Sequence, residues 1–210
     1  MLVVGLTGGI GVGKSTVAGL LGERGAAVVD VDGLGREIIA PGGRAVDAVV
    51  DRFGPQVRAA DGGVDRAALA GIVFGSEEEL AALNAISHPA INELLDERVD
   101  ALIAEHDERE LVVIFDMAVL VESTLGQDTR HPYEVVVTVE APMDIRLDRL
   151  ELRGTPRDDA RARIESQATD EQRRAVSQFV VANGGDLESL EAAVDELWTE
   201  LRRLNDARHG

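Results

Sequence analysis

Apolar residues along the chain gather in short runs that predict the strands of a buried parallel sheet. The runs cover residues 2–6, 26–32, 111–115, 134–139 and 178–181. Short runs without polar alternation are typical of strands that are covered on both faces. The second run ends in Asp30 and Asp32, at the carboxyl edge where open α/β sheets bind their ligands. The pattern therefore predicts an α/β protein with acidic side chains at its binding edge.

Between these runs the apolar positions recur with the spacing of helices. Helices are predicted over residues 45–53, 67–74, 77–86, 91–103, 143–153, 158–167 and 187–204. Residue His88 precedes Pro89, and the residue before a proline is disfavoured in a helix, so we expect a break there and a new helix just beyond. The block 34–110 contains no strand signal and is too long for a crossover, which predicts an inserted helical subdomain.

Composition narrows the classes of function. The chain has 210 residues, 45% hydrophobic and 3% aromatic, with no cysteine and a net charge of −18. This charge repels nucleic acids and anionic membranes, and few aromatic residues are available to stack on bases. No apolar stretch approaches the roughly 20 residues that span a bilayer, and the N-terminus leads straight into a strand. We expect a cytoplasmic protein without thiolate metal sites, nucleic-acid partners or membrane partners.

The segment 8–16 matches the phosphate-binding pattern G-x-x-x-x-G-K-[ST], and it lies between a predicted strand and a predicted helix. Its Lys14 is the only lysine in the chain. Gly8 and Gly13 let backbone N–H groups point into an anion-binding concavity, Lys14 reaches the β- and γ-phosphates, and Ser15 supplies a hydroxyl to Mg²⁺. A dinucleotide fingerprint would need glycine or alanine in place of Lys14. No lysine remains for a guanine-binding element, so a small-molecule kinase and an ATPase remain as candidates.

Several side chains have both a functional and a structural interpretation. Asp32 could orient an acceptor hydroxyl or cap a helix N-terminus. Arg146, Arg149 and Arg153 form one helical stripe that could close over ATP or form a solvated, ion-paired face. His88 could be only the residue that begins a helix.

Beyond the phosphate-binding loop, further motifs follow one another in a recognisable order. They are Val29-Asp30-Val31-Asp32 with Arg36, Phe53-Gly54 with Asp61-Gly62, His88-Pro89-Ala90-Ile91, Asp116 to Glu122, Arg149 with Arg153, Arg163-Ile164 with Gln167, and Val181-Ala182-Asn183-Gly184. With these motifs, residues from about 3 to 190 resemble the dephospho-CoA kinase family. The resemblance implies transfer of a phosphoryl group from ATP to the ribose 3′-hydroxyl of dephospho-CoA, with Mg²⁺. A P-loop kinase for nucleosides or nucleotides is the alternative.

The resemblance also implies an architecture and a set of site residues. It implies a P-loop kinase-like five-stranded parallel sheet as a core (1–33, 111–141 and 176–210), an acceptor-binding insert (34–110) and an arginine-bearing lid (142–175). Catalytic roles are expected for Lys14, Asp32 and Arg149. Nucleotide contacts are expected from Gly9, Ile10, Gly11, Val12, Gly13, Lys14, Ser15, Thr16, Arg153, Asn183 and Gly184. Acceptor contacts are expected from Asp32, Arg36, His88 and Leu120.

Some of these assignments stay open at the level of sequence. Asn183 and Gly184 would face adenine or form an ordinary turn. Asp116 ends an apolar strand as a metal-binding carboxylate would, although the resemblance places it at the base of an acceptor loop. The expected partners are ATP and dephospho-CoA, and the chain is expected to be a monomer or a weak homo-oligomer.

The sequence departs from the family pattern at two places. Ala118 stands where the family usually has proline, which removes a backbone constraint and could shift the loop 119–122. Ser177-Gln178 stands where the family usually has Ala-Asp, which removes a carboxylate that we expect near the adenine.

Overall fold

Five parallel strands form a single sheet in the order β2-β3-β1-β4-β5 in the computed structural model, which describes residues 1–209. The strands are β1 (Leu2–Thr7), β2 (Ala27–Asp30), β3 (Val112–Asp116), β4 (Val135–Glu140) and β5 (Phe179–Ala182). All five predicted strands are present, and the predicted parallel sheet is confirmed. Because the strands run in one direction, their carboxyl ends meet at one edge of the sheet, where β1 and β3 bring Thr7 and Asp116.

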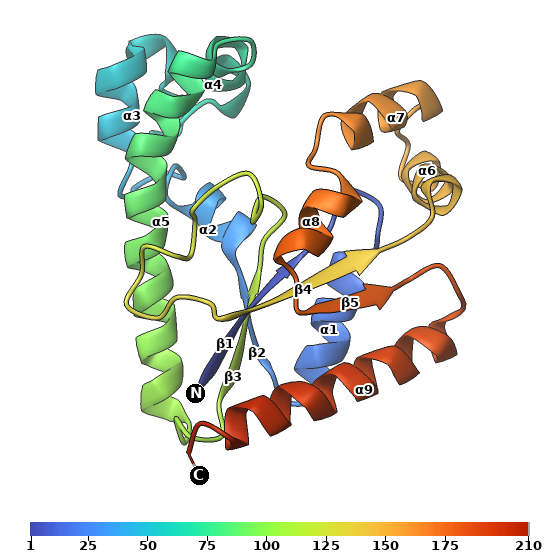
Figure 1. The fold of residues 1–210 in the computed structure, drawn as a ribbon. Coiled ribbons are helices and arrows are strands. Elements are labelled where there is room, and N and C mark those ends of the chain that lie inside the picture. The colour runs from blue at the N-terminus through green and yellow to red at the C-terminus, as the bar shows by residue number, and fades with distance from the viewer. Residues whose placement is uncertain (210) are drawn as a thin grey trace.

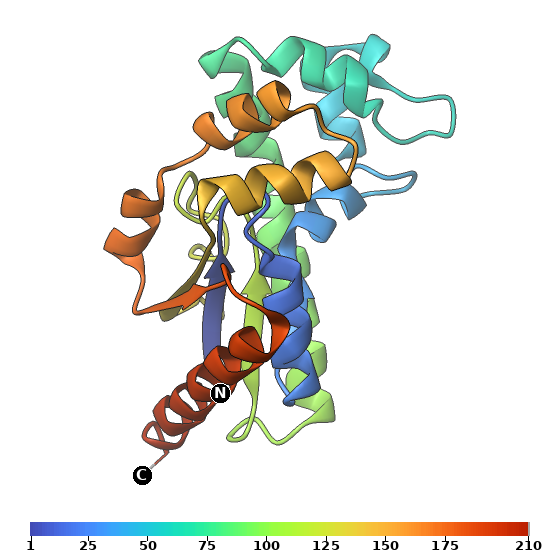
Figure 2. The same ribbon diagram turned by 90° about the vertical axis from the view of Figure 1, so that its right-hand side faces the viewer.

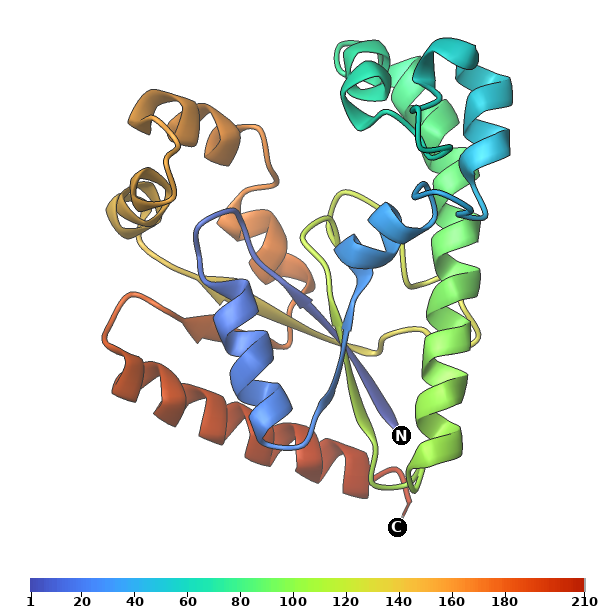
Figure 3. The same ribbon diagram turned by 180° about the vertical axis from the view of Figure 1, so that it is seen from behind.

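Helices cover both faces of the sheet (Figure 3). On one face, α1 (Lys14–Glu23) and α9 (Leu187–Asp206) pack their apolar sides against alternate strand residues such as Val4 and Ile114. On the other face, the C-terminal half of α5 (Glu77–Glu105) packs against Val3 and Val113. Successive strand residues point to opposite faces, so uninterrupted apolar runs are needed to fill both cores.

Two helical groups rise on either side of the carboxyl edge of the sheet (Figure 1). One group consists of α2 (Val31–Glu37), α3 (Val46–Phe53), a 3-10 turn (Pro55–Val57), α4 (Arg66–Val73) and the first half of α5. The other consists of α6 (Met143–Leu152), α7 (Arg157–Glu165) and α8 (Asp170–Val176). The first group shares one continuous apolar core with the sheet, whereas α6 and α7 enclose a small core of their own.

The predicted break at Pro89 is wrong, because α5 runs without interruption through it. Proline inside a helix costs about 3 kcal/mol through its missing N–H and its clash with the preceding turn. Burying each large aliphatic side chain stabilises the fold by about 1.5–3 kcal/mol, and Ile91, Leu94, Leu95 and Val99 are all buried just beyond the proline. Tertiary packing therefore outweighs the local penalty, and His88 lies in mid-helix rather than at a helix start.

Two further local differences affect the binding edge. The second strand ends at Asp30 instead of Asp32, because the Asp30 side chain accepts the Gly33 N–H at 2.8 Å and starts α2. Helix α8 was not predicted, although Thr169 and Gln172 form a complete capping box at its start. Within residues 1–209, no helix is both long enough and apolar enough to span a membrane.

Candidate active site

The phosphate-binding loop connects β1 to α1, and glycines give it its shape. Gly11 and Gly13 have φ angles of 84° and 91°, in the left-handed region that side chains disfavour. A Cβ atom on Gly13 would also overlap the Asn183 amide, and one on Gly9 would overlap the Arg146 guanidinium. The loop can approach its neighbours this closely only because these positions carry no side chain.

Side chains from outside the loop hold its carbonyl groups. Arg146 Nε donates to Ile10 O at 3.0 Å, and Arg149 Nη1 donates to the carbonyls of Gly11 and Val12 at 3.3 and 3.1 Å. Asn183 Nδ2 adds a bond to Val12 O at 2.8 Å. Because the peptide unit is planar, carbonyls fixed on the outer side favour N–H groups turned to the inner side, where an anion would bind.

The predicted stripe of arginines on α6 therefore divides into different environments. Arg146 is only 4% exposed, and burial lowers the pKa of its guanidinium although Asp170 opposes this shift. Arg146 therefore does not lie on the solvated, ion-paired face that was the alternative to an ATP contact, and it supports the loop instead. Arg149 bonds the loop, and Arg153 follows the helix at the surface. Figure 2 shows α6 lying across the loop between β1 and α1.

Lys14 lies between two carboxylates at the carboxyl edge of the sheet. Its Nζ forms an ion pair with Asp116 at the end of β3 and lies 3.6 Å from Asp32 Oδ2 on α2. Burial raises the pKa of the Asp116 carboxyl, while Lys14 partly offsets the shift. The chain thus brings its only lysine and two separate acidic segments to one point.

Asp32 is held by a backbone donor and does not cap a helix. The Ala118 N–H donates to its two carboxylate oxygens at 3.4 and 3.2 Å. The helix cap is Asp30, which also pairs with Arg36 at 2.9 Å, so the capping interpretation of Asp32 is wrong. Proline has no N–H and could not make the bond at position 118. The departure at Ala118 therefore adds a donor to the carboxylate of Asp32.

A cavity of about 390 Å³ opens beside Asp32, between α2, α4, α5 and the segment that follows β3. It brings together three of the predicted acceptor residues, Asp32, Arg36 and His88. Leu120 does not line it. Its side chain is 5% exposed and packs against Gly5, while its neighbour Val119 faces the cavity instead.

Sequence reasoning missed other residues that line this cavity. They are Arg66, Asn84, Ser87, Val119 and Leu125, together with apolar residues of α2 and α5. Asn84 and His88 are four residues apart and so share a face of α5. That signal was lost because the helix was predicted to break at Pro89.

His88 is the titratable imidazole of the cavity. Burial lowers its pKa from the ordinary value of 6.5, and the Asp128 carboxylate partly offsets this shift. At neutral pH the side chain is therefore an uncharged hydrogen-bonding group in the free protein.

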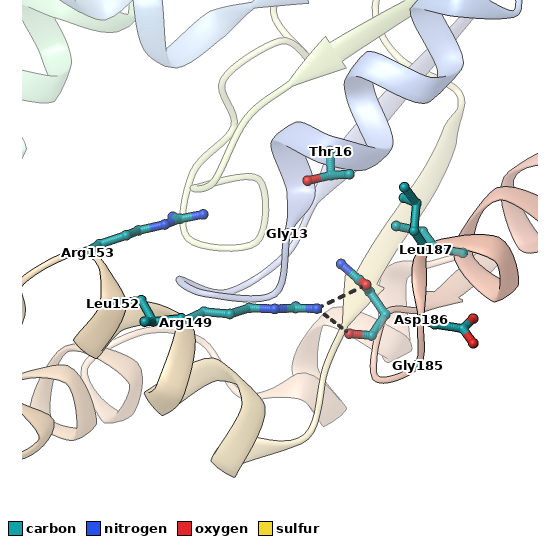
Figure 4. Close-up of a pocket in the computed structure, with 10 residues that line it drawn as sticks. Gly13, Thr16, Arg149, Leu152, Arg153, Gly185, Asp186 and Leu187 are labelled. Carbon is teal, nitrogen blue, oxygen red and sulfur yellow. Dashed lines mark hydrogen bonds between the residues drawn. The ribbon is translucent and has the colours of Figure 1, made fainter.

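A second cavity, of about 340 Å³, lies on the opposite side of the loop (Figure 4). It includes the predicted nucleotide residues Gly13, Thr16, Arg153 and Asn183. Arg149 crosses its floor and donates to Asn183 O and Oδ1 at 3.1 and 3.2 Å. Asn183 lies at the end of β5 and ties this cavity to the loop.

The lining of this cavity extends further along the chain than the sequence suggested. Sequence reasoning missed Leu152, Gly185, Asp186, Leu187 and Leu190. Gly184 does not line the cavity and instead packs against Pro142. Gln178 lies just before β5, at the opposite end of that strand from Asn183, and accepts the Val136 N–H at 2.7 Å. The expectation that Ser177-Gln178 removes a carboxylate near the adenine stays a prediction.

The residues present suit a magnesium ion that is bound mainly by phosphate oxygens. Within residues 1–209, no group of three or more His, Cys, Asp or Glu side chains could hold a metal ion by itself. Ser15 is exposed in the first turn of α1, beside Lys14 and its two carboxylates. Magnesium in kinases is typically bound by one or two protein groups and the substrate phosphates, which fits this arrangement.

Comparisons with known proteins agree along almost the entire chain. A family model described as dephospho-CoA kinase matches residues 2–189. The dephospho-CoA kinase of Thermobifida fusca is 45% identical over 99% of this chain and 100% of its own, and that of Frankia casuarinae is 44% identical over 99% and 87%. The solved structure of TT1252 from Thermus thermophilus has a TM-score of 0.75 and 32% identity, covering 95% of this chain and 97% of its own.

Proposed function

The chain belongs to the dephospho-CoA kinase family, and from that premise we propose how its residues transfer a phosphoryl group from ATP to dephospho-CoA. The protein is a kinase that phosphorylates dephospho-CoA in the last step of coenzyme A biosynthesis. The matching family model and relatives are dephospho-CoA kinases, which does not favour the alternative of a nucleoside or nucleotide kinase. The position of Asp32 carries the proposal for the site, because this carboxylate lines the acceptor cavity and lies 3.6 Å from Lys14.

We assign the nucleotide to the phosphate-binding loop and the 340 Å³ cavity. The N–H groups of Gly11 and Gly13 would hold the phosphates together with those of Lys14 and Ser15, and the N-terminal end of α1 would add its positive dipole. The base and ribose would occupy the space between Arg153, Asn183 and Asp186. Arg149 bonds two loop carbonyls and also borders this cavity, a position from which it would polarise the loop and offset charge on the nucleotide.

Lys14 would add phosphate oxygens to its carboxylate partners when ATP binds. An ammonium group on a flexible stem can move between such partners, and it would remain beside Asp32 and Asp116. Magnesium, when bound with ATP, neutralises charge on the phosphates, and Ser15 is the residue that would contact it. Asp116 would remain the counter-charge that keeps Lys14 at the sheet edge.

The acceptor is assigned to the 390 Å³ cavity. The diphosphate of dephospho-CoA needs cationic or donor groups, and Arg36, Arg66 and His88 line that cavity. The oxygen of the ribose 3′-hydroxyl would form a bond to the γ-phosphorus, and Asp32 would accept the proton of that hydroxyl. The bond from that phosphorus to the β,γ-bridging oxygen breaks, and ADP leaves. Late proton transfer in a loose transition state makes small demands on the basicity of an aspartate.

The assignment is tested by measuring ADP production with Mg·ATP and dephospho-CoA, AMP, CMP or no acceptor. We expect strong stimulation by dephospho-CoA alone and a product that carries one additional phosphate on the ribose 3′-oxygen. ADP release at the same rate without an acceptor would contradict the roles of Asp32 and His88. Equal stimulation by AMP would instead support the nucleotide kinase alternative.

The functional division of the chain follows from this assignment. Residues 1–33, 111–141 and 176–210 would form the nucleotide core, 34–110 the acceptor region and 142–175 the lid. Action in the cytoplasm, and a monomeric or weakly oligomeric state, remain predictions.

A further inference from the structure

The segment that joins α7 to α8 contacts both binding regions through two adjacent residues. Gln167 Oε1 accepts the N–H of Ile10 in the phosphate-binding loop at 2.7 Å. The N–H of Ala168 donates to Glu122 Oε1, in the segment between β3 and β4, at 2.9 Å. Residues 167 and 168, which we call the joint, therefore connect two parts of the molecule that are more than a hundred residues apart in sequence.

On the nucleotide side, Ile10 is held from several directions. Gln167 takes its N–H, Arg146 donates to its carbonyl, and its side chain packs against the small core of α6 and α7. The peptide on either side of Ile10 cannot turn without breaking one of these contacts. A displacement of the joint would therefore move the phosphate-binding loop.

On the acceptor side, Glu122 belongs to a turn that is bonded within itself. Ser123 Oγ donates to Val119 O at 2.9 Å and accepts the Leu125 N–H at 3.3 Å. Val119 and Leu125 both line the acceptor cavity. A ligand that presses on these two side chains would shift Glu122 with them, because the turn is held together as one unit.

Arg173 of α8 fixes Glu122 to the joint. Its side chain is 1% exposed, it donates to the carbonyl of Ala168, and its Nη2 lies 3.4 Å from Glu122 Oε1. Its Nε atom is buried without a hydrogen-bond partner among the described residues. A buried guanidinium needs a nearby carboxylate, and within residues 1–209 the other one that Arg173 pairs with is Asp170, at 3.9 Å. Separating Glu122 from Arg173 would therefore be costly, so a shift of Glu122 would carry Arg173 and the joint with it.

We propose that this joint couples the two substrate sites, so that dephospho-CoA in the acceptor cavity increases the affinity of the phosphate-binding loop for ATP. Glu122 and Gln167 are the positioning residues of this coupling, and neither contacts the reacting atoms. The inference rests on the proposed location of the acceptor site. Coupling of this kind is a free-energy difference, and reciprocity requires ATP to strengthen dephospho-CoA binding by the same factor.

The test is the dissociation constant of a non-hydrolysable ATP analogue, measured by calorimetry with Mg²⁺, with and without saturating dephospho-CoA. We expect dephospho-CoA to tighten analogue binding by about five-fold or more in the natural protein. Glu122→Ala and Gln167→Met should each reduce that factor to below about two, while the analogue alone binds within about three-fold of the natural protein. If Glu122→Ala unfolds because Arg173 loses its counter-charge, Gln167→Met still removes the hydrogen bond from the Ile10 N–H to the joint. That variant leaves the pair of Glu122 and Arg173 intact.

Matched controls separate coupling from general loss of packing. Gln178 also accepts a backbone N–H at 2.7 Å, from Val136, but it does so just before β5, at the edge of the sheet away from the phosphate-binding loop. Glu134 forms an ion pair with Arg208 near the chain termini. Gln178→Met and Glu134→Ala should keep the coupling of the natural protein.

Two results would overturn the inference while leaving the function intact. They are dephospho-CoA binding without any effect on the analogue in the natural protein, and full coupling in Gln167→Met. If dephospho-CoA did not bind with or without the analogue, the proposed function would fail, and this inference with it.

Discussion

The two sides of the phosphate-binding loop are built in opposite ways. On the nucleotide side, the guanidinium of Arg146 is almost completely buried, and those of Arg146 and Arg149 are bonded to backbone carbonyls. On the acceptor side, the Arg36 side chain is 54% exposed and forms an ion pair with Asp30, while Arg66 projects from α4 at the surface. One side is fixed before a ligand arrives, and the other keeps its charged groups available.

This difference fits what each substrate requires. A triphosphate is recognised mainly by backbone N–H groups, which must be oriented in advance because a reorganising loop would lose binding free energy. A flexible acceptor that carries a diphosphate can be bound by mobile side chains. The lesson is that burial of a charged side chain near an active site can indicate support of the backbone instead of contact with substrate.

Lys14→Arg should have the largest effect, because Lys14 lies where the two sides meet. We expect turnover to fall by about 10³-fold, since a planar guanidinium would not fit between Asp32 and Asp116 and still reach the phosphates. Thermal unfolding should remain cooperative, which circular dichroism can check. Kinase rates close to those of the natural protein would remove this lysine from the mechanism.

Asp32→Asn should affect the acceptor side and leave the nucleotide side largely unchanged. Turnover is expected to fall by about 10²-fold, because the amide cannot accept the proton of the ribose hydroxyl. The affinity for ATP should change far less, because the loop and its arginines are untouched. Steady-state kinetics and nucleotide binding by calorimetry give the two numbers. Matched losses in both would indicate that Asp32 mainly supports Lys14 and Ala118.

A pair of glycine substitutions tests how tightly each side is packed. Gly9→Ala would place a methyl group on the buried Arg146 guanidinium, so KM for ATP should rise by about ten-fold, as overpacking costs about 1–3 kcal/mol. Gly71→Ala, in α4 on the acceptor side, meets open space. It should leave ATP kinetics unchanged and stabilise the protein by about 0.5–1 kcal/mol. A Gly9→Ala variant with an unchanged KM for ATP would contradict the close packing of the loop against Arg146.

The smallest effect is expected from pH at the acceptor side. Burial holds the pKa of His88 below 6.5, and a bound polyanion would raise it, so dephospho-CoA binding should take up a proton. Affinity should therefore increase by about three-fold as the pH falls from about 8 to about 6. His88→Gln should lose this increase, which calorimetry in two buffers can measure.

The same shift affects stability with the opposite sign. In the free protein, the unfolded chain binds a proton at His88 more readily than the folded chain does. This residue therefore favours folding above pH 6.5, and its contribution is lost as the pH falls below that value.

If Kd for dephospho-CoA did not change with pH in the natural protein, His88 would not sense the charge of the ligand.

The sequence by itself determined the sheet and the loop. Apolar runs identified every strand, and the central strands β1, β3 and β4 lack polar alternation because they are buried on both faces, although the edge strands β2 and β5 are partly exposed. The glycine spacing with Lys14 identified the loop because the chemistry of a phosphate cradle is local. Asp32, Arg36 and His88 were placed in the acceptor region through family motifs, and the structure brings them into one cavity.

Only the tertiary structure decided which partner each side chain takes. No local pattern shows that α5 continues through Pro89, because the compensation comes from buried contacts with other elements. The same holds for Arg146 and Arg149, which bond a loop more than a hundred residues away, and for the Ala118 N–H on Asp32. Sequence patterns report spacing along one segment, whereas burial and hydrogen bonding between segments depend on how the whole chain packs.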